Sequence, residues 1–229
     1  MAAEVPADGP EAVEVFGVAL DQARRYAELL ATDGVKRGLI GPRETERLWD
    51  RHLLNCAVVS ELLPERGVLV DIGSGAGLPG VVLAMLRPSL QVILLEPLLR
   101  RSVFLEECVA ELGLSNTTVL RARAEEKAAA HIEADVATAR AVAPLDRLAG
   151  WAARLLRPGG ELLAIKGQSA DEEIAAAQPA LSRLGVRSAE VLQAGHGRVV
   201  MATTVVRVVM GGHGREERAG AQRSRRGVA

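Results

Sequence analysis

The chain has 229 residues, 48% of them hydrophobic, which suits one α/β domain with a full core and an added element or two. Its formal net charge is −1 and only 2% of its residues are aromatic, so it offers few rings for stacking on nucleic-acid bases. No stretch reaches the roughly 18 apolar residues of a membrane span, and the acidic N-terminus does not resemble a signal peptide. We therefore expect a cytoplasmic monomer that makes no contact with membranes.

Two helices are predicted before the first strand. One begins at Pro10, with Asp8 near its cap, and carries an apolar stripe of Phe16, Leu20, Ala23 and Ala27. The segment 34–42 interrupts it, and a second helix is expected over 44–63, ended by Pro64. These helices are too few to form a core of their own, so we expect residues 1–66 to be a helical extension packed on the main domain.

From residue 67 to 210 the chain alternates apolar strands with helices. Strands are expected near 68–72, 91–96, 117–121, 135–140, 160–166, 186–192 and 198–209. Helices are expected near 79–86, 99–113, 144–156 and 170–184. This alternation predicts an α/β fold with a doubly wound, mostly parallel sheet, in which the last strand pairs with the one before it.

The segment 211–229 is expected to be a basic, disordered tail, because it is rich in glycine and has little to bury. It holds five arginines and two glutamates. Such a tail either grips nucleic acid or only keeps the protein soluble, and its composition does not separate the two.

The cysteines and histidines do not indicate a metal site. Cys56 and Cys108 lie in apolar helical patterns and are expected to be reduced core residues. Three histidines, at 131, 196 and 213, have no spacing typical of metal ligands. We therefore expect no metal.

The most informative segment is the glycine-dense turn that follows the strand at 68–72. Gly75, Gly77 and Gly80 fit the dinucleotide fingerprint, whereas Asp71 followed by Gly73, Gly75 and Gly77 resembles the first motif of class I S-adenosylmethionine (SAM) methyltransferases. An acid aimed into the turn opposes an anionic pyrophosphate but favours the ammonium and sulfonium of SAM. The turn therefore favours SAM over a nicotinamide cofactor without excluding the latter.

Glu96 ends the next predicted strand, 21 residues after Gly75. A carboxylate at this place can accept hydrogen bonds from both ribose hydroxyls of an adenosine. SAM and NAD share that ribose, so Glu96 supports a nucleoside cofactor of either kind.

Several motifs together resemble the ribosomal RNA small subunit methyltransferase G family, also called GidB. They are the residues 71–80, Arg100-Arg101-x-x-Phe104-Leu105, Arg123-Ala124-Glu125, Thr138-Ala139-Arg140-Ala141, Lys166-Gly167 and, upstream, Trp49-x-Arg51-His52-x-x-Asn55. The resemblance implies a class I SAM-dependent methyltransferase with a Rossmann-like fold. It also implies methyl transfer to N-7 of a guanine in the 530 loop of 16S rRNA, presented as free RNA, as the small ribosomal subunit or as an assembly intermediate.

The resemblance also implies roles for individual residues. Glu96 would bind the ribose, Ala124 and Glu125 would lie on the adenine side, and Arg140 would stand at the cofactor and substrate end of its strand. The cofactor-binding set is then Asp71, Gly73, Ser74, Gly75, Gly77, Leu78, Glu96, Ala124, Glu125 and Arg140.

Guanine N-7 has an in-plane lone pair and attacks a sulfonium methyl without first losing a proton. We therefore expect no general base and assign Arg140 a positioning role. His52 and Lys166 are candidate RNA contacts, although a half-buried helical histidine and a lysine that reaches out from the sheet edge explain them almost as well. Arg100, Arg101, Arg121 and Arg123 form a basic rim beside the site or simply a solvated face.

Three other functions remain open from the sequence. A SAM methyltransferase acting on another substrate, such as a small molecule, is compatible with the acidic body and few aromatic residues. A nicotinamide-dependent oxidoreductase predicts binding of NAD and not of SAM. A non-catalytic SAM- and RNA-binding protein predicts SAM binding without turnover.

Overall fold

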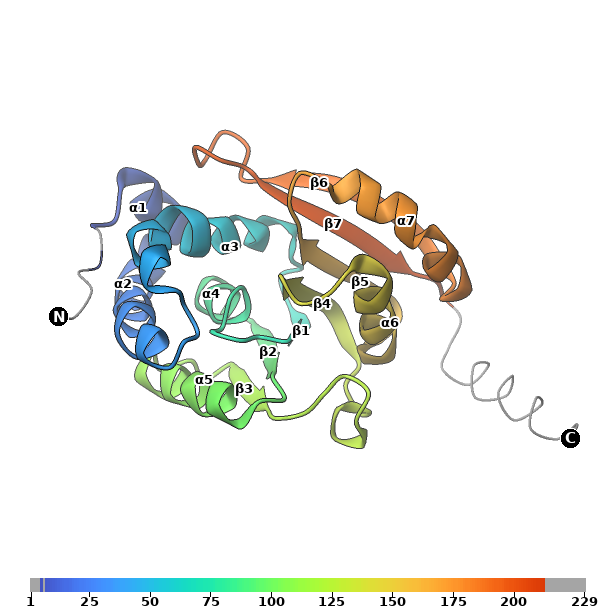
Figure 1. Ribbon diagram of the computed structural model, residues 1–229, viewed down its shortest axis with the longest axis horizontal. Helices are drawn as coiled ribbons and strands as arrows, with labels where there is room; N and C mark the ends of the chain where they lie inside the picture. The colour runs from blue at the N-terminus through green and yellow to red at the C-terminus, as the bar shows by residue number, and fades with distance from the viewer. Residues whose placement is uncertain (1–4, 6, 213–229) are drawn as a thin grey trace, which may run out of the picture.

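The computed structural model describes residue 5 and residues 7–212. Its centre is a seven-stranded sheet (Figure 1). The strands are β1 Gly67–Ile72, β2 Leu90–Leu95, β3 Thr117–Leu120, β4 Ala134–Arg140, β5 Leu156–Ile165, β6 Val186–Ala194 and β7 Thr203–Met210. Their order across the sheet is β3-β2-β1-β4-β5-β7-β6.

The first five strands are parallel, and β7 joins the sheet antiparallel to both β5 and β6. In the middle of the sheet Leu69 of β1 lies opposite Val92 of β2 and Val136 of β4. The strand order reverses between β1 and β4, and open α/β sheets bind ligands at such a switch point, beyond the carboxyl ends of the strands. The predicted doubly wound, mostly parallel sheet is confirmed.

Helices cover both faces of the sheet, as Figure 1 shows. The longer ones after β1 are α4 Gly80–Leu86, α5 Leu99–Glu111, α6 Leu145–Leu155 and α7 Ala170–Arg183, with a short 3-10 turn, η6 Lys127–Ala129. The helices α4 and α5 pack on one face together with the N-terminal segments, and α6 and α7 pack on the other.

The N-terminal part of the chain is helical but irregular. It comprises α1 Pro10–Phe16, η1 Gly17–Ala19, α2 Leu20–Leu29, η2 Leu30–Gly34, η3 Pro42–Arg47, η4 Leu48–Leu54, α3 Asn55–Ala57 and η5 Val58–Leu62. The expected second helix is therefore a run of 3-10, π and α turns. Its inner side chains, such as Leu53 and Val58, lie in the same hydrophobic cluster as Leu83 of α4.

The first helix begins at Pro10 with Gly9 as its N-cap, so Asp8 lies next to the cap as expected, and its carboxylate pairs with Arg24 at 2.9 Å. The last strand begins at Thr203 rather than at 198, because the chain makes a turn with positive φ angles at Gly195 and Gly197. Val199 and Val200, which the sequence placed in the strand, therefore lie in the connection between β6 and β7.

Within the described part of the chain, no helix is long and apolar enough to cross a membrane. The same residues contain no cluster of three or more side chains suited to a metal ion. Cys56 and Cys108 are both free and buried, as expected. Most of the tail predicted for 211–229 lies outside the described residues.

Candidate functional site

A cavity of about 1070 Å³ opens beyond the carboxyl ends of β1, β2, β4 and β5. The N-terminal segments η3 and η4 and the residue Met201, before β7, complete its wall. It gathers ten of the twelve residues singled out from the sequence: Gly73, Ser74, Gly75, Leu78, Glu96, Ala124, Glu125, Arg140, His52 and Lys166. Asp71 and Gly77 are not among its lining residues.

The glycine turn forms the cavity wall at the end of β1. The N–H groups of Gly73 and Ser74 both donate to the carbonyl of Leu95, at 2.8 and 3.2 Å, which ties the turn to β2. Gly73 has φ +68° and Gly75 has φ +59°, in the left-handed region that only glycine adopts freely. At Gly73 and Gly75 the turn thus presents backbone, without a side chain, to the cavity.

Glu96 sits at the edge of the same turn, at the end of β2. Its carboxylate is 1% exposed and accepts hydrogen bonds from the N–H of Gly75 at 3.0 Å and the N–H of Leu98 at 2.9 Å. These bonds leave one lone pair on each oxygen for a donor in the cavity. The carboxylate is therefore fixed in place and still able to accept a diol.

Asp71 lies behind the turn and supports it. One carboxylate oxygen accepts from the N–H of Gly80 at 3.1 Å and the other from the hydroxyl of Thr138 at 3.2 Å. Complete burial raises the pKa of Asp71 to about 6. Its charge can act on a ligand through the turn, but its oxygens are used inside the protein.

Gly77 is a packing residue rather than a lining residue. A Cβ atom at this position would lie 2.6 Å from the hydroxyl oxygen of Tyr26 and 2.6 Å from Cγ2 of Val81. The Tyr26 hydroxyl donates to the carbonyl of Ala76 at 2.6 Å. The sequence did not indicate this contact, which joins the N-terminal helix α2 to the glycine turn; the only hint is that Tyr26 is the single tyrosine of the chain.

Arg140, at the end of β4, is anchored to η4 by two hydrogen bonds. Its Nη1 donates to the carbonyl of Arg51 at 3.2 Å, and its Nη2 lies 2.9 Å from Nδ1 of His52. The other ring nitrogen of His52 lies 3.0 Å from the carboxylate of Glu44. Burial is the largest cause that lowers the pKa of His52, and the positive charge of Arg140 is the second. Both nitrogens of His52 thus have partners within the protein.

Lys166 follows β5 and also has partners. Its ammonium forms an ion pair with Glu173 at 2.6 Å and donates to the carbonyl of Ala143 at 3.1 Å. Glu173 belongs to the first turn of α7, where its negative charge also suits the helix dipole. Its pairing with Lys166 is a second contact that the sequence did not indicate.

The far end of the cavity lies after β3. Ala124 is buried there, and the carboxylate of Glu125 accepts a hydrogen bond from the indole N–H of Trp151 in α6. Of the four arginines expected to form a basic rim, Arg101 and Arg123 line the cavity, and Arg100 and Arg121 do not. Arg101 lies 3.8 Å from the Glu96 carboxylate.

These features fit a bound SAM. The volume lies just above the range of about 300–1,000 Å³ that is typical of small-molecule sites. The buried Glu96 suits a ribose diol, the open glycine turn suits close backbone approach, and the buried charge of Asp71 suits a cation. Leu78 and Ile72 add apolar surface to the wall.

The comparisons with known proteins agree with this geometry. The family model described as "rRNA small subunit methyltransferase G" (GidB) matches residues 19–201. A protein named "Ribosomal RNA small subunit methyltransferase G" from Thermobifida fusca is 60% identical over 206 residues, covering 90% of this chain and 86% of its own. A protein of the same name from Streptomyces coelicolor is 58% identical, covering 92% and 88%.

Solved structures resemble this chain at the level of the fold. A putative SAM-dependent methyltransferase from Methanococcus maripaludis has a TM-score of 0.56 at 14% identity, covering 84% of this chain and 94% of its own. A precorrin-6y C5,15-methyltransferase from Geobacter metallireducens has a TM-score of 0.53 at 16% identity, covering 72% and 91%. The sheet is thus that of class I methyltransferases, and the chain belongs to the rRNA small subunit methyltransferase G (GidB) family.

Proposed function

We propose that this protein transfers a methyl group from SAM to N-7 of a guanine in the 530 loop of 16S rRNA. The observation that carries the proposal is that one cavity joins a nucleoside-binding set, the glycine turn and Glu96, to Arg140, a cation on β4 that two residues of η4 hold in place. Membership of the GidB family supports the assignment of the substrate.

The cofactor supplies an electrophilic methyl group on a sulfonium. The part of the chain in this step is to bind and orient. Glu96 would accept hydrogen bonds from the ribose hydroxyls, Gly73 to Gly75 would leave room for the cofactor against the backbone, and Ala124 and Glu125 would lie on the adenine side. The negative charge of Asp71 favours the cationic part of the ligand from behind the turn.

The substrate side requires alignment rather than proton transfer, because guanine N-7 is already a nucleophile. Among the described cations that line the cavity, Arg140 and Arg123 have no carboxylate partner, whereas Arg51, Arg101 and Lys166 each lie within 4 Å of one. A guanidinium without a carboxylate partner has no neighbouring negative charge to neutralise it. It can therefore attract an anionic or oxygen-rich group of the RNA. Arg140 can bind O6 of the guanine or a phosphate, but a donor placed on N-7 itself would block attack.

His52 and Lys166 take different parts in this proposal. His52 has both nitrogens engaged, so we assign the RNA contact to Arg140 and the role of holding Arg140 to His52. Lys166 lines the cavity with a side chain that is 11% exposed, and its ammonium is paired with Glu173. An RNA phosphate that binds Lys166 therefore shares the ammonium with the Glu173 carboxylate. Since its substrate is ribosomal, the proposal places the protein in the cytoplasm, acting as a monomer on the small subunit or an intermediate of its assembly.

Two measurements test the function. Titration of the protein with SAM and with NAD should show binding of SAM alone. Incubation with labelled SAM should then transfer label to unmethylated 16S rRNA or 30S subunits and not to 23S rRNA. Binding of NAD alone would favour an oxidoreductase. SAM binding without transfer to any RNA would favour a small-molecule substrate or a non-catalytic protein.

A further inference from the structure

A chain of three side chains crosses the wall of the cavity. Glu44 comes from η3, His52 from η4 and Arg140 from β4. The Glu44 carboxylate lies 3.0 Å from Nε2 of His52, and Nδ1 of His52 lies 2.9 Å from Nη2 of Arg140. His52 is only 8% exposed, so water does not compete freely for either nitrogen. The imidazole ring of His52 therefore links the carboxylate of Glu44 to the guanidinium of Arg140 at the end of β4.

The chemistry of the partners fixes the proton on that ring. An arginine side chain has only donors, so Nδ1 of His52 must accept the hydrogen bond from Arg140. The proton of the neutral ring is then on Nε2, which donates to the Glu44 carboxylate. Glu44 also stops the ring from turning over, because the opposite orientation would leave the carboxylate facing a carbon atom.

The two anchors of Arg140 are both uncharged. They are the carbonyl of Arg51 and the neutral ring of His52, at 3.2 and 2.9 Å. A carboxylate in either place would hold the guanidinium equally well but would neutralise it. This arrangement orients Arg140 without using up its charge.

We propose that Glu44 and His52 are positioning residues for methyl transfer, which hold Arg140 toward the cavity while His52 is neutral and release it when His52 is protonated. This inference rests on the proposed function of the same cavity. An imidazolium would point an N–H at the guanidinium of Arg140, so the hydrogen bond would be lost and two positive charges would face each other.

The charged groups that act on His52 come from all three elements. Arg140 from β4 and Arg51 from η4 disfavour the imidazolium, and Glu44 from η3 favours it. Burial, the largest cause, adds to the effect of the arginines, so the pKa of His52 lies below its ordinary value of 6.5. Arg140 is therefore held at neutral pH, and its release belongs to more acidic conditions.

Two substitutions of His52 separate positioning from simple packing. The side-chain oxygen of asparagine takes the place of Nδ1, and that of glutamine takes the place of Nε2. We expect His52→Asn to keep kcat within about threefold of the wild type, and His52→Gln to lose at least about tenfold, the scale of one lost hydrogen bond to a charged group. Melting temperature and SAM affinity, measured in parallel, show whether both variants are folded.

The pH dependence gives a second readout that a packing role would not produce. The ratio of wild-type kcat to that of His52→Asn should fall as pH drops through the pKa of His52. The ratio cancels the contribution of Asp71, which titrates near pH 6 in both proteins. The ratio of the kcat of Glu44→Ala to that of His52→Asn should fall at lower pH than the wild-type ratio does, because the carboxylate that favours the imidazolium is gone. Glu46→Ala, an exposed neighbour in η3, is the matched control.

A measurement without RNA keeps this inference separate from the proposed function. At pH 7.5, nitrogen-15 NMR should show the ring of His52 with a proton on Nε2 and none on Nδ1. The signals of His52 are identified by their absence from the spectrum of His52→Asn. The opposite tautomer, or an imidazolium at that pH, would overturn the inference whatever the substrate is. Equal losses of activity in the folded Asn and Gln variants, or a pH profile unchanged by Glu44→Ala, would also overturn it.

Discussion

At the scale of single residues, the cavity depends on positions where a side chain is excluded or a charge is buried. Gly73 is an example of the first kind. A Cβ atom there would lie 3.0 and 3.1 Å from the two methyl carbons of Val142, and its φ of +68° already strains any other residue. A larger side chain must therefore displace Val142 or enter the space of the cofactor.

Gly73→Asp should abolish SAM binding, because the new carboxylate fills the space beside the turn. Calorimetric titration with SAM measures this directly. Gly113→Asp is the matched control: Gly113 has a similar φ of +64° and nothing within 4 Å of an added Cβ, so it carries the same backbone strain away from the cavity. Unchanged SAM affinity in Gly73→Asp would contradict the assignment of the site.

Arg140→Ala should lower kcat/KM for rRNA methylation far more than it lowers fold stability. The guanidinium lines the cavity and makes two hydrogen bonds to η4, so its loss removes the proposed contact to RNA and frees one carbonyl and one ring nitrogen. Steady-state methylation and thermal unfolding provide the comparison, with Arg183→Ala on α7 as a control. A loss of less than about threefold, which is under ~1 kcal/mol, would show that Arg140 has no key role.

The buried carboxyl group of Asp71 should make the folding stability of the protein depend on pH. Its folded pKa of about 6 is above the ordinary 3.8, so the native state holds the proton more tightly than the unfolded chain does. The stabilisation from this group is therefore full below pH 3.8 and is lost as pH rises through about 6. Asp71→Asn removes the ionisation, so the variant should gain stability relative to the wild type between pH 4 and pH 7.5.

Urea unfolding of both proteins at pH 4 and pH 7.5 tests this expectation. A stability difference that does not change with pH would show that Asp71 is not a buried titrating group. SAM affinity at pH 7.5 should fall in the variant, since the negative charge behind the glycine turn is gone.

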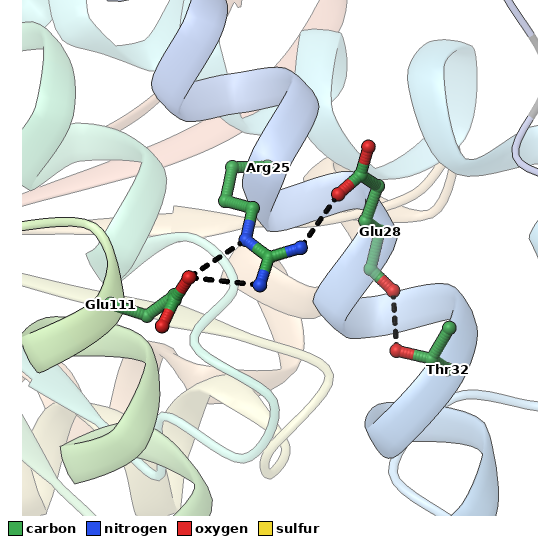
Figure 2. Close-up of polar contacts among 4 residues, drawn as sticks. All are labelled: Arg25, Glu28, Thr32 and Glu111. Carbon is green, nitrogen blue, oxygen red and sulfur yellow. Dashed lines mark hydrogen bonds and ion pairs between the residues drawn. The ribbon is translucent and has the colours of Figure 1, made fainter.

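At the scale of elements, the N-terminal helix α2 has two different faces. Its outer face carries exposed ion pairs: Arg25 pairs at 2.8 Å with Glu28 of the same helix and with Glu111 of α5 (Figure 2). The hydroxyl of Thr32, in η2, donates to the carbonyl of Glu28. Pairs of this kind are screened by water and salt, so they contribute little stability. The inner face carries Tyr26, whose buried hydrogen bond reaches the glycine turn.

Tyr26→Phe should therefore lower both stability and SAM affinity. The change leaves the carbonyl of Ala76 without its donor in a buried place, which costs about 1–3 kcal/mol. Chemical unfolding and SAM titration measure the two effects. Arg25→Ala, one residue earlier on the exposed face, should change neither by a comparable amount. Wild-type SAM affinity in Tyr26→Phe would show that the turn holds its shape without α2.

The sequence predicted those elements that have a strong local pattern. The apolar strands and the glycine turn are examples, because their periodicity and their glycines are properties of a few neighbouring residues. The irregular turns over 42–62 escaped prediction because tertiary packing of Leu53 and Val58, not local preference, shapes them. The pairs Lys166–Glu173 and Glu44–His52 and the Tyr26 contact escaped because they depend on the orientation of side chains brought together by the fold.

At the scale of the whole molecule, the N-terminal segments and the sheet share one hydrophobic cluster. Tyr26 and Leu53 belong to the same cluster as Leu69 of β1 and Phe104 of α5. The hydrogen bond between Asn55 and Thr203, at 2.8 Å, joins the same segments to β7. The helical extension is thus part of the body that shapes the cavity.

The net charge of the molecule bears on how it meets RNA. The segment 213–229 carries five arginines and two glutamates, while the whole chain has a net charge of −1. If those arginines contact phosphates, removing 213–229 should weaken RNA affinity and reduce the slope of log K against log salt by about 0.7 for each lost contact. Binding measured between 50 and 300 mM salt tests this. An unchanged slope would assign the segment a passive role.

The most direct test of the central claim is to identify the nucleotide that this protein modifies. Unmethylated 16S rRNA and 30S subunits would be incubated with the protein and labelled SAM, digested, and analysed by mass spectrometry. We predict a single 7-methylguanosine in the 530 loop, with much less label incorporated when Arg140→Ala replaces the wild type. Methylation of another base or another atom, or no transfer to either substrate while SAM binding is intact, would contradict the account.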